Sequence, residues 1–237
     1  MNAAQATRSA DLYAAAYEMK YQLPEDRAAE VEAWGRRNFA PDKHSEGGVY
    51  RITSLYFDTH EFDIYFRTPD YYRWRKFRIR RYSLGEVAYL ERKTRKGNRV
   101  AKKRWKIPLV ELSKLTDQEA SKDWEGHSFH RRLKERRLVP SLLVQYLRTA
   151  FEAEGSEGPM RLTLDRQVEG APANAISLNP LPGARRVLPG RVIVELKFRA
   201  ALPGAFRRLI GDLRLDPGPV SKYRLCWEAW GGPSVHA

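Results

Sequence analysis

Basic side chains are concentrated in residues 72–106, which contain fifteen Lys and Arg and two Glu. They recur at alternate positions, as in Lys76, Arg78 and Arg80. Because side chains two apart on a strand share one face, this spacing places the charges together. Like charges held this close repel each other, and a bound anion relieves the repulsion. The spacing therefore indicates a site for an anionic ligand.

Apolar residues alternate with these charges and complete three strands. Phe77 and Ile79 take the face opposite Lys76 and Arg78. The charged faces of the next two strands carry Tyr89, Glu91 and Lys93, and then Lys102, Arg104 and Lys106, on either side of a turn at Gly97-Asn98. A helix would scatter such charges, whereas adjacent antiparallel strands gather them into one cationic wall. A solvated face usually mixes both signs, so this wall favours binding over simple solvation.

A second pattern, Glu-x-Lys on a strand with an apolar opposite face, occurs three times. The copies are Glu18-x-Lys20, Glu91-x-Lys93 and Glu195-x-Lys197. One copy is weak evidence, but three predict a sheet whose charged side faces a shared, wet interior.

The composition favours one large domain with a polyanionic partner. The chain has 237 residues, enough to bury a sizeable core, and a formal net charge of +14. Nucleic acid, an anionic membrane surface, and nucleotide or polyphosphate all fit that charge. Charge alone does not choose among them.

Cysteine usage and hydropathy predict a cytoplasmic protein. The single cysteine, Cys226, cannot form an internal disulfide, which is typical of a reducing compartment. No run approaches the roughly 20 apolar residues of a spanning helix, and residues 1–12 lack a signal-peptide core. We expect no direct membrane insertion; at a membrane, a membrane-protein partner would recruit the chain.

Further strands and helices must position the charged wall. We expect further strands at residues 17–21, 50–59, 142–151, 161–165, 192–198 and 220–230, and helices at 24–38, 124–137 and after Pro203. Residues 170–190 are rich in Pro and Gly and predict a long loop. For the domain organisation we expect disordered ends at 1–12 and 231–237 around a single domain at 13–230.

The motifs, taken in order, resemble the vacuolar transporter chaperone (VTC) domain of the triphosphate tunnel metalloenzymes. The resemblance covers about residues 15–228 and rests on the number and order of its motifs. They are Glu18-x-Lys20, SLYFDT at 54–59, Lys76-x-Arg78-x-Arg80, YLERK at 89–93, Lys102-x-Arg104, Tyr146-x-Arg148, Arg161-x-Thr-x-Asp165, Glu195-Leu-Lys197 and Ser221-Lys222-Tyr223.

The resemblance implies an α+β fold: a closed antiparallel β-barrel with a polar, cationic lumen and helices packed outside. It implies a polyphosphate polymerase that moves the ATP γ-phosphate onto a polyphosphate chain with a divalent metal, Mn²⁺ or Mg²⁺. Two alternatives stay open, a tunnel triphosphatase acting on nucleoside or inorganic triphosphate, and a non-catalytic polyphosphate-binding module. The expected partners are ATP and polyphosphate or triphosphate, and no nucleic acid is expected.

The resemblance also implies residue roles. Those that look like catalytic phosphate contacts are Lys20, Arg78, Arg80, Lys93, Lys102, Arg148, Arg161, Lys197 and Lys222, with Arg104 as a further substrate contact. Glu195 resembles the metal-binding carboxylate and Glu18 is a candidate for a second. The wider superfamily has an E-x-E-x-K strand, and Ala16 here replaces its first acidic residue. His127 and His130, three apart on a predicted helix, are interpreted as surface residues rather than metal ligands.

Overall fold

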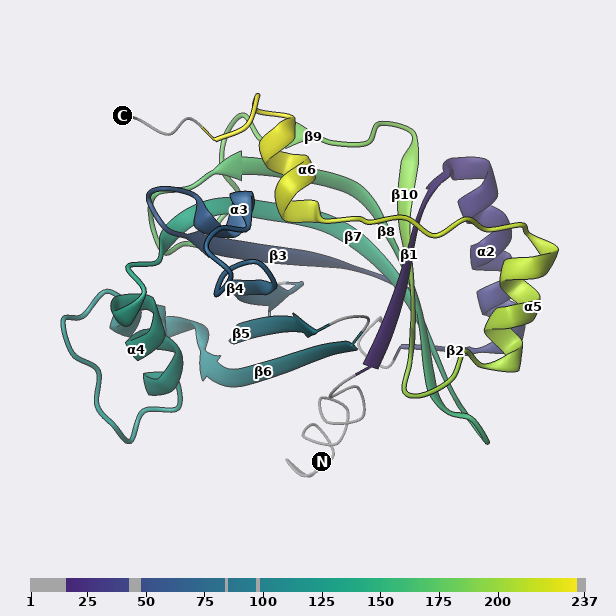
Figure 1. The fold of residues 1–237 in the computed structure, drawn as a ribbon, viewed down its shortest axis with the longest axis horizontal. Coiled ribbons are helices and arrows are strands. Elements are labelled where there is room, and N and C mark those ends of the chain that lie inside the picture. The colour runs from purple at the N-terminus through teal and green to yellow at the C-terminus, as the bar shows by residue number, and fades with distance from the viewer. Residues whose placement is uncertain (1–15, 43–47, 84, 97–98, 234–237) are drawn as a thin grey trace.

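The computed structural model describes residues 16–42, 48–83, 85–96 and 99–233 (Figure 1). Its strands are β1 (Ala16–Pro24), β2 (Ala40–Pro41), β3 (Val49–Asp58), β4 (Arg75–Tyr82), β5 (Val87–Lys96), β6 (Arg99–Pro108), β7 (Val139–Gly155), β8 (Gly158–Pro172), β9 (Arg185–Arg186) and β10 (Arg191–Phe198). Its helices are α2 (Glu25–Asn38), α3 (Asp63–Phe66), α4 (His127–Glu135), α5 (Gly204–Asp212), α6 (Lys222–Glu228) and the 3₁₀ helix η2 (Leu109–Leu115). The predicted disordered segment 1–12, most of the predicted tail and the Gly97-Asn98 turn lie outside the described residues.

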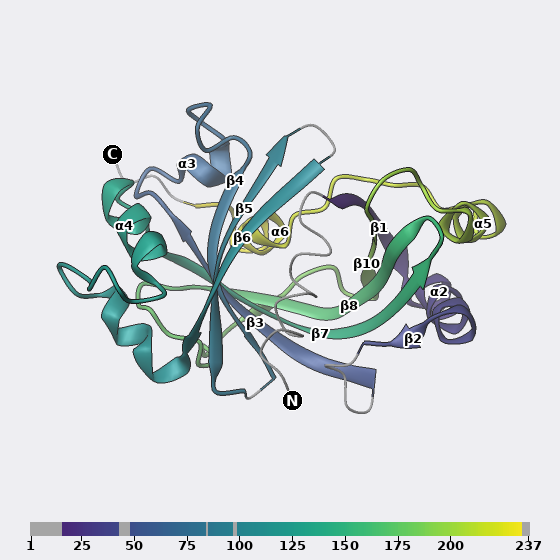
Figure 2. The same cartoon turned by 90° about the horizontal axis from the view of Figure 1, so that it is seen from below.

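All strand pairs are antiparallel, and the sheet is strongly curved (Figure 2). Its strand order is β2-β7-β3-β4-β5-β6-β1-β10-β8-β9, and β7 also pairs with β8. The contact between β6 and β1 consists of two residue pairs, Ala16 with Val100 and Tyr17 with Arg99. The antiparallel α+β fold is therefore confirmed, whereas a barrel closed by hydrogen bonds along its height is not.

Helices cover the outer face of the sheet at two places (Figure 1). The Phe129 ring of α4 lies 6.0 Å from Phe57, 6.3 Å from Phe77 and 6.1 Å from Trp105. At the opposite end, α2 and α5 pack on apolar residues of β1, β8 and β10, including Leu162, Val194 and Leu196. Alternation along the strands leaves the charged residues on the inner face, the side of the sheet away from these helices.

Residues 220–230, predicted as a strand, instead contain helix α6, so that prediction was wrong. The Ser221 side chain accepts a hydrogen bond from the Arg224 backbone N–H at 3.4 Å and caps the helix. Tyr223, Cys226 and Trp227 are buried, at a spacing that places them on one side of a helix. The helix aims Ser221 and Lys222 at the sheet.

Other elements match the predictions with shifted bounds. α4 is shorter than predicted, because Trp124 and Gly126 belong to a turn before it. β7 and β8 are longer than predicted, since they form one continuous hairpin from Leu142 to Pro172. The strand predicted at 142–151 is therefore confirmed as part of β7.

His130 is buried rather than on the surface, and this corrects the surface interpretation. Its Nε2 lies 2.9 Å from the Asp117 carbonyl oxygen, and His127 Nδ1 lies 3.1 Å from the Ala120 carbonyl oxygen. Both rings thus contact the segment before α4. Among the described residues, no helix combines the length and apolar character that crossing a membrane requires.

Candidate functional site

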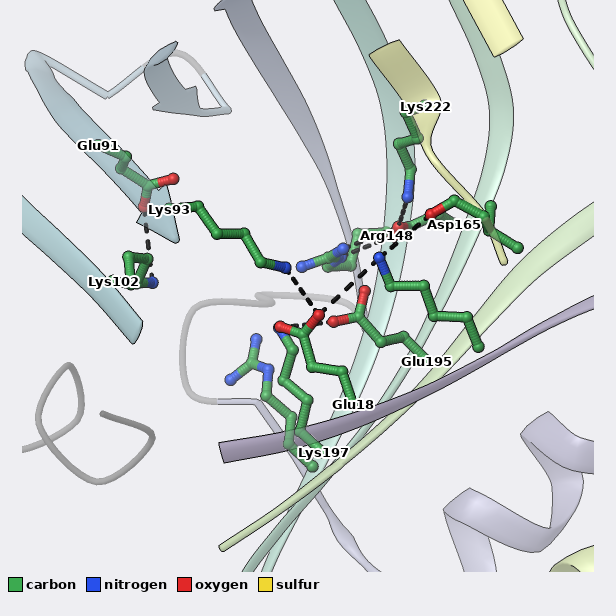
Figure 3. A network of polar contacts seen from close by, with 12 residues as sticks. Glu18, Glu91, Lys93, Lys102, Arg148, Asp165, Glu195, Lys197 and Lys222 are labelled. Carbon is green, nitrogen blue, oxygen red and sulfur yellow. Dashed lines mark hydrogen bonds and ion pairs between the residues drawn. The ribbon is translucent and has the colours of Figure 1, made fainter. Parts of the chain in front are cut away.

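Charged side chains from seven strands (β1, β4, β5, β6, β7, β8 and β10) and from α6 converge on the inner face of the sheet (Figure 3). Strand register explains the convergence, since Glu18 pairs with Lys197 and Lys20 with Glu195 across β1 and β10. Every residue predicted for the site lies on this face, and most of the cations are grouped around buried carboxylates.

Glu91 organises the first group. Its carboxylate is fully buried and lies between Arg78 and Arg104 of the neighbouring strands, with Nε–O distances of 2.7 and 2.8 Å. Lys102 Nζ lies 3.6 Å from the same carboxylate. Burial opposes ionisation, but the charges of Arg78, Lys102 and Arg104 hold the pKa of Glu91 well below its usual range. A single anion thus holds three cations.

Glu18 and Glu195 form the second group. Lys197 Nζ contacts both, at 3.7 Å from Glu18 and 2.9 Å from Glu195, and Lys93 Nζ lies 2.7 Å from Glu18. Although burial and Glu195 oppose ionisation, Lys93, Lys197 and Lys20 lower the pKa of Glu18 to about 2. The pKa of Glu195 is also well below its usual range, because Lys197 and Lys20 outweigh the effect of burial. Both side chains are therefore carboxylates at neutral pH.

Asp165 holds the third group together. Arg148 donates two parallel hydrogen bonds to it, at 2.6 and 2.7 Å, and Lys222 of α6 approaches its Oδ2 to 2.6 Å. Burial opposes ionisation, but Arg148 and Lys222 lower the pKa of Asp165 to about 2. Lys222 Nζ also lies 4.7 Å from the centre of the Tyr146 ring. Asp165 therefore joins the hairpin β7–β8 to α6.

Two inner-face cations are held by hydroxyl groups. Arg80 donates to Ser54 Oγ and Tyr146 Oη, each at 3.1 Å. Lys76 donates to Ser221 Oγ at 2.7 Å. Among the described residues, neither forms an ion pair with a carboxylate. Burial and the charges of Lys20, Lys93 and Arg78 lower the pKa of Lys76 well below its usual range, and a bound anion would oppose that shift.

Arg161 shares the inner face but is more fully paired than the other cations. It contacts the carboxylates of Asp42 and Glu152 and donates to Tyr50 Oη at 3.1 Å. It also lies opposite Lys197 in the β8–β10 register. A phosphate at Arg161 would compete with two carboxylates.

Three inner-face residues are absent from the predicted site: Lys76, Glu91 and Asp165. The signal was available, because each shares the alternate spacing of predicted neighbours on its own strand. The ion pairs of Glu91 and Asp165 show that these carboxylates hold the cations in place.

Glu18 and Glu195 suit a hard divalent cation. Both are ionised, and their common contact with Lys197 places them side by side. Mg²⁺ and similar ions commonly use one or two protein carboxylates and take phosphate and water oxygens for the remaining positions. No group of three or more metal-ligating side chains occurs among the described residues.

Solved structures from several organisms share this fold. A candidate adenylate cyclase from Bacillus halodurans aligns with a TM-score of 0.52 and 10% identity, over 88% of this chain and 94% of its own. A candidate adenylyl cyclase from Hippeastrum, described with a dominant triphosphatase activity, aligns with a TM-score of 0.51 and 15% identity, over 92% and 97%. A conserved hypothetical protein from Pyrococcus furiosus aligns with a TM-score of 0.50 and 14% identity, over 89% and 99%. At these identities the likeness shows a common fold alone.

The family assignment rests on the sequence of almost the whole chain. No curated protein matches it. The model of the VTC domain family matches residues 15–230, a range that includes every strand and helix described above. The chain therefore belongs to the VTC domain family.

Proposed function

We propose that this protein is a metal-dependent polyphosphate polymerase whose curved sheet encloses a cationic tunnel. The observation that supports the proposal is the convergence of Lys and Arg from seven strands and α6 around a few buried carboxylates. A linear phosphate chain carries negative charge along its length, and such a wall matches it along that length.

The residues contribute mainly by positioning and by charge. The terminal phosphate oxygen of the chain forms a bond to the γ-phosphorus of ATP, while the bond from that phosphorus to the bridging oxygen breaks and ADP leaves. Arg78 and Arg104, fixed by Glu91, present planar donors to equatorial phosphate oxygens. Lys197 and Lys93 add compact positive charge beside Glu18. No protein nucleophile is required.

Glu18 and Glu195 would hold the divalent ion, Mn²⁺ or Mg²⁺. When bound, the ion would neutralise charge on the phosphate oxygens of the substrate. Lys197, which contacts both carboxylates, would then be released toward phosphate.

A tunnel triphosphatase is the second candidate. The structurally similar Hippeastrum protein is described with a dominant triphosphatase activity, which favours this candidate. Water would then replace the chain end as the attacking group. The same inner face would also serve a module that binds polyphosphate without catalysis.

One incubation separates the three functions. The purified protein is mixed with ATP and Mn²⁺, and long-chain polyphosphate, ADP and free phosphate are measured separately. A polymerase yields polyphosphate with equimolar ADP and little free phosphate. Free phosphate without polymer would establish the triphosphatase instead. If the protein binds polyphosphate but turns over neither ATP nor inorganic triphosphate, it is the non-catalytic binding module.

A further inference from the structure

A second set of arginines lies on the outer side of the same strands. Arg75 directly precedes Lys76 on β4, and Arg92 lies between Glu91 and Lys93 on β5. Because neighbouring side chains on a strand face opposite ways, both arginines lie across the wall from the inner face. α4 adds Arg132 and, at its C-terminal cap, Arg136.

These outer arginines gather around one aromatic ring. The guanidinium carbons of Arg75 and Arg136 lie over the Tyr71 ring, 4.0 and 4.1 Å from its centre. Partial burial and the charges of Arg132 and Arg75 lower the pKa of Arg92, so these charges are close enough to oppose one another. The group is therefore compact.

The group lacks compensating anions. Among the described residues, Arg75, Arg92, Arg132 and Arg136 form no ion pair with a carboxylate. Arg92 Nε is also a buried donor without a hydrogen-bond partner in that part of the chain. An unsatisfied buried donor costs free energy, and a neighbouring cluster of like charges adds to that cost.

The segment before β4 connects this group to the inner face. Arg67 lies close enough to Lys76 for its charge to contribute to the lowered pKa of that lysine, after burial and the charges of Lys20, Lys93 and Arg78. Arg73 is near Arg67, packs over Trp74 at 5.4 Å and forms an exposed ion pair with Asp70 at 3.7 Å. Arginines thus continue from Lys76 through residues 67–75 to α4. We name the set Arg67, Arg73, Arg75, Arg92, Arg132 and Arg136 the outer arginine track.

We infer that the outer arginine track binds the part of a linear inorganic polyphosphate that extends beyond the inner face. The inference rests on the proposed function and adds the path that the polymer takes outside the site. A triphosphate is short and is held on the inner face, whereas a longer chain reaches the track and gains further guanidinium contacts.

The aromatic rings favour inorganic polyphosphate over nucleic acid. Proteins that bind single strands stack bases on aromatic side chains. Two guanidinium groups already lie over Tyr71, and Arg73 lies over Trp74. Stacking a base would require displacement of an arginine, whereas phosphate uses the arginines as they stand.

The test compares ligands of different length. Dissociation constants for sodium tripolyphosphate and for long-chain sodium polyphosphate, expressed per chain, are measured by calorimetry at fixed ionic strength. The test variant is R132Q/R136Q, with R75Q as a second variant from another element. The control R199Q/R208Q removes the same charge from two exposed residues, Arg199 directly after β10 and Arg208 in α5, and α5 lies at the opposite end of the molecule from α4 (Figure 1).

Wild type and the control are expected to bind long chains more tightly than tripolyphosphate. R132Q/R136Q is expected to lose about tenfold of long-chain affinity, the scale of losing charge-assisted contacts, and to bind tripolyphosphate as wild type does. An equal loss of long-chain affinity in the control R199Q/R208Q, or no loss in either track variant, would contradict the proposed role of the outer arginine track. If the track variants lose as much affinity for single-stranded DNA of matched charge as for long-chain polyphosphate, the outer arginine track is a nucleic-acid site instead. If tripolyphosphate does not bind the wild type, the proposed function of the inner face is itself contradicted. If tripolyphosphate binds but the track variants keep their long-chain affinity, only the outer arginine track is contradicted.

Discussion

Glu195 carries a negative charge where most neighbours are positive. Its side chain is buried and contacts Lys197 at 2.9 Å, and Lys20 and Lys93 help to keep its pKa low. Such a carboxylate either balances the lysines or binds a cation. The two roles have different consequences when the charge is removed.

The substitution Glu195→Gln keeps the shape of the side chain and removes its charge. We expect metal-dependent turnover to fall by about 10², the scale of losing a group that supports charge stabilisation in the transition state. Turnover is measured across a Mn²⁺ titration, with circular dichroism to verify folding. Glu154→Gln, at an exposed position on β7, is the matched control. Unchanged turnover at every metal concentration would remove Glu195 from the site.

Lys102 gives the site a dependence on pH. Burial lowers its pKa to about 8; Glu91 opposes that shift and Arg104 adds to it. The ammonium form binds an anion and the neutral amine does not, so affinity for tripolyphosphate should fall as pH rises through 8. In Lys102→Arg the charge persists over this range. Between pH 7 and 9 we therefore expect the affinity of the wild type for tripolyphosphate to fall by up to about tenfold more than that of the variant. Parallel pH profiles for wild type and variant would show that Lys102 does not contact the ligand.

At the scale of elements, Asp58 ties α6 to the sheet. Its carboxyl group is fully buried at the end of β3 and accepts backbone N–H groups of Thr59, Ile64 and Tyr65 at 2.8, 2.8 and 3.0 Å. It also accepts the Tyr223 hydroxyl at 2.5 Å. Because Tyr223 follows Lys222, this network fixes the lysine that reaches Asp165.

The stability of this junction should depend on pH. Burial raises the pKa of Asp58 to about 6, even though its hydrogen bonds oppose the shift. The folded state therefore binds more protons than the unfolded chain between about pH 4 and 6, and this contribution to stability is lost as pH rises through 6. The contribution is on the order of 3 kcal/mol, from about two pKa units.

Asp58→Asn removes that titration. The free energy of unfolding, measured in urea from pH 4 to 7, should fall with pH more in wild type than in the variant. Exposed Asp212→Asn on α5 serves as the control and should follow wild type. A constant difference between wild type and Asp58→Asn across this range would contradict the raised pKa.

The sequence predicted the strands of the charged wall well, because a period of two is a local property. It thereby identified the face on which Arg78, Lys93 and Lys197 lie. It did not predict the partners of these charges, since the sharing of Glu91 by β4 and β6 depends on strand register, which local spacing leaves open. α6 was missed because a short helix of seven residues shows little periodicity, although Ser221 is a good helix cap.

At the scale of the whole molecule, a chain with a formal net charge of +14 places clusters of cations on both faces of one wall. Inside, buried carboxylates hold the cations in fixed positions but leave Lys76 and Arg80 without anionic partners among the described residues. Outside, Arg75, Arg92, Arg132 and Arg136 of the outer arginine track also form no ion pair with a carboxylate in the described part of the chain. Bound phosphate would reduce the repulsion in the folded state, whereas the unfolded chain disperses the same charges.

Thermal unfolding with tripolyphosphate tests this account most directly. A ligand that binds only the folded state stabilises it by roughly 2.7 kcal/mol at a hundredfold excess over Kd, or about 5–10 °C in Tm for a domain of this size. We predict such a rise for wild type and the control Arg208→Gln, and a smaller rise for Arg78→Ala and Lys197→Ala. Sodium chloride at matched ionic strength and duplex DNA should produce much less. An equal rise with chloride or DNA, or an undiminished rise in both Arg78→Ala and Lys197→Ala, would contradict a phosphate site on the inner face.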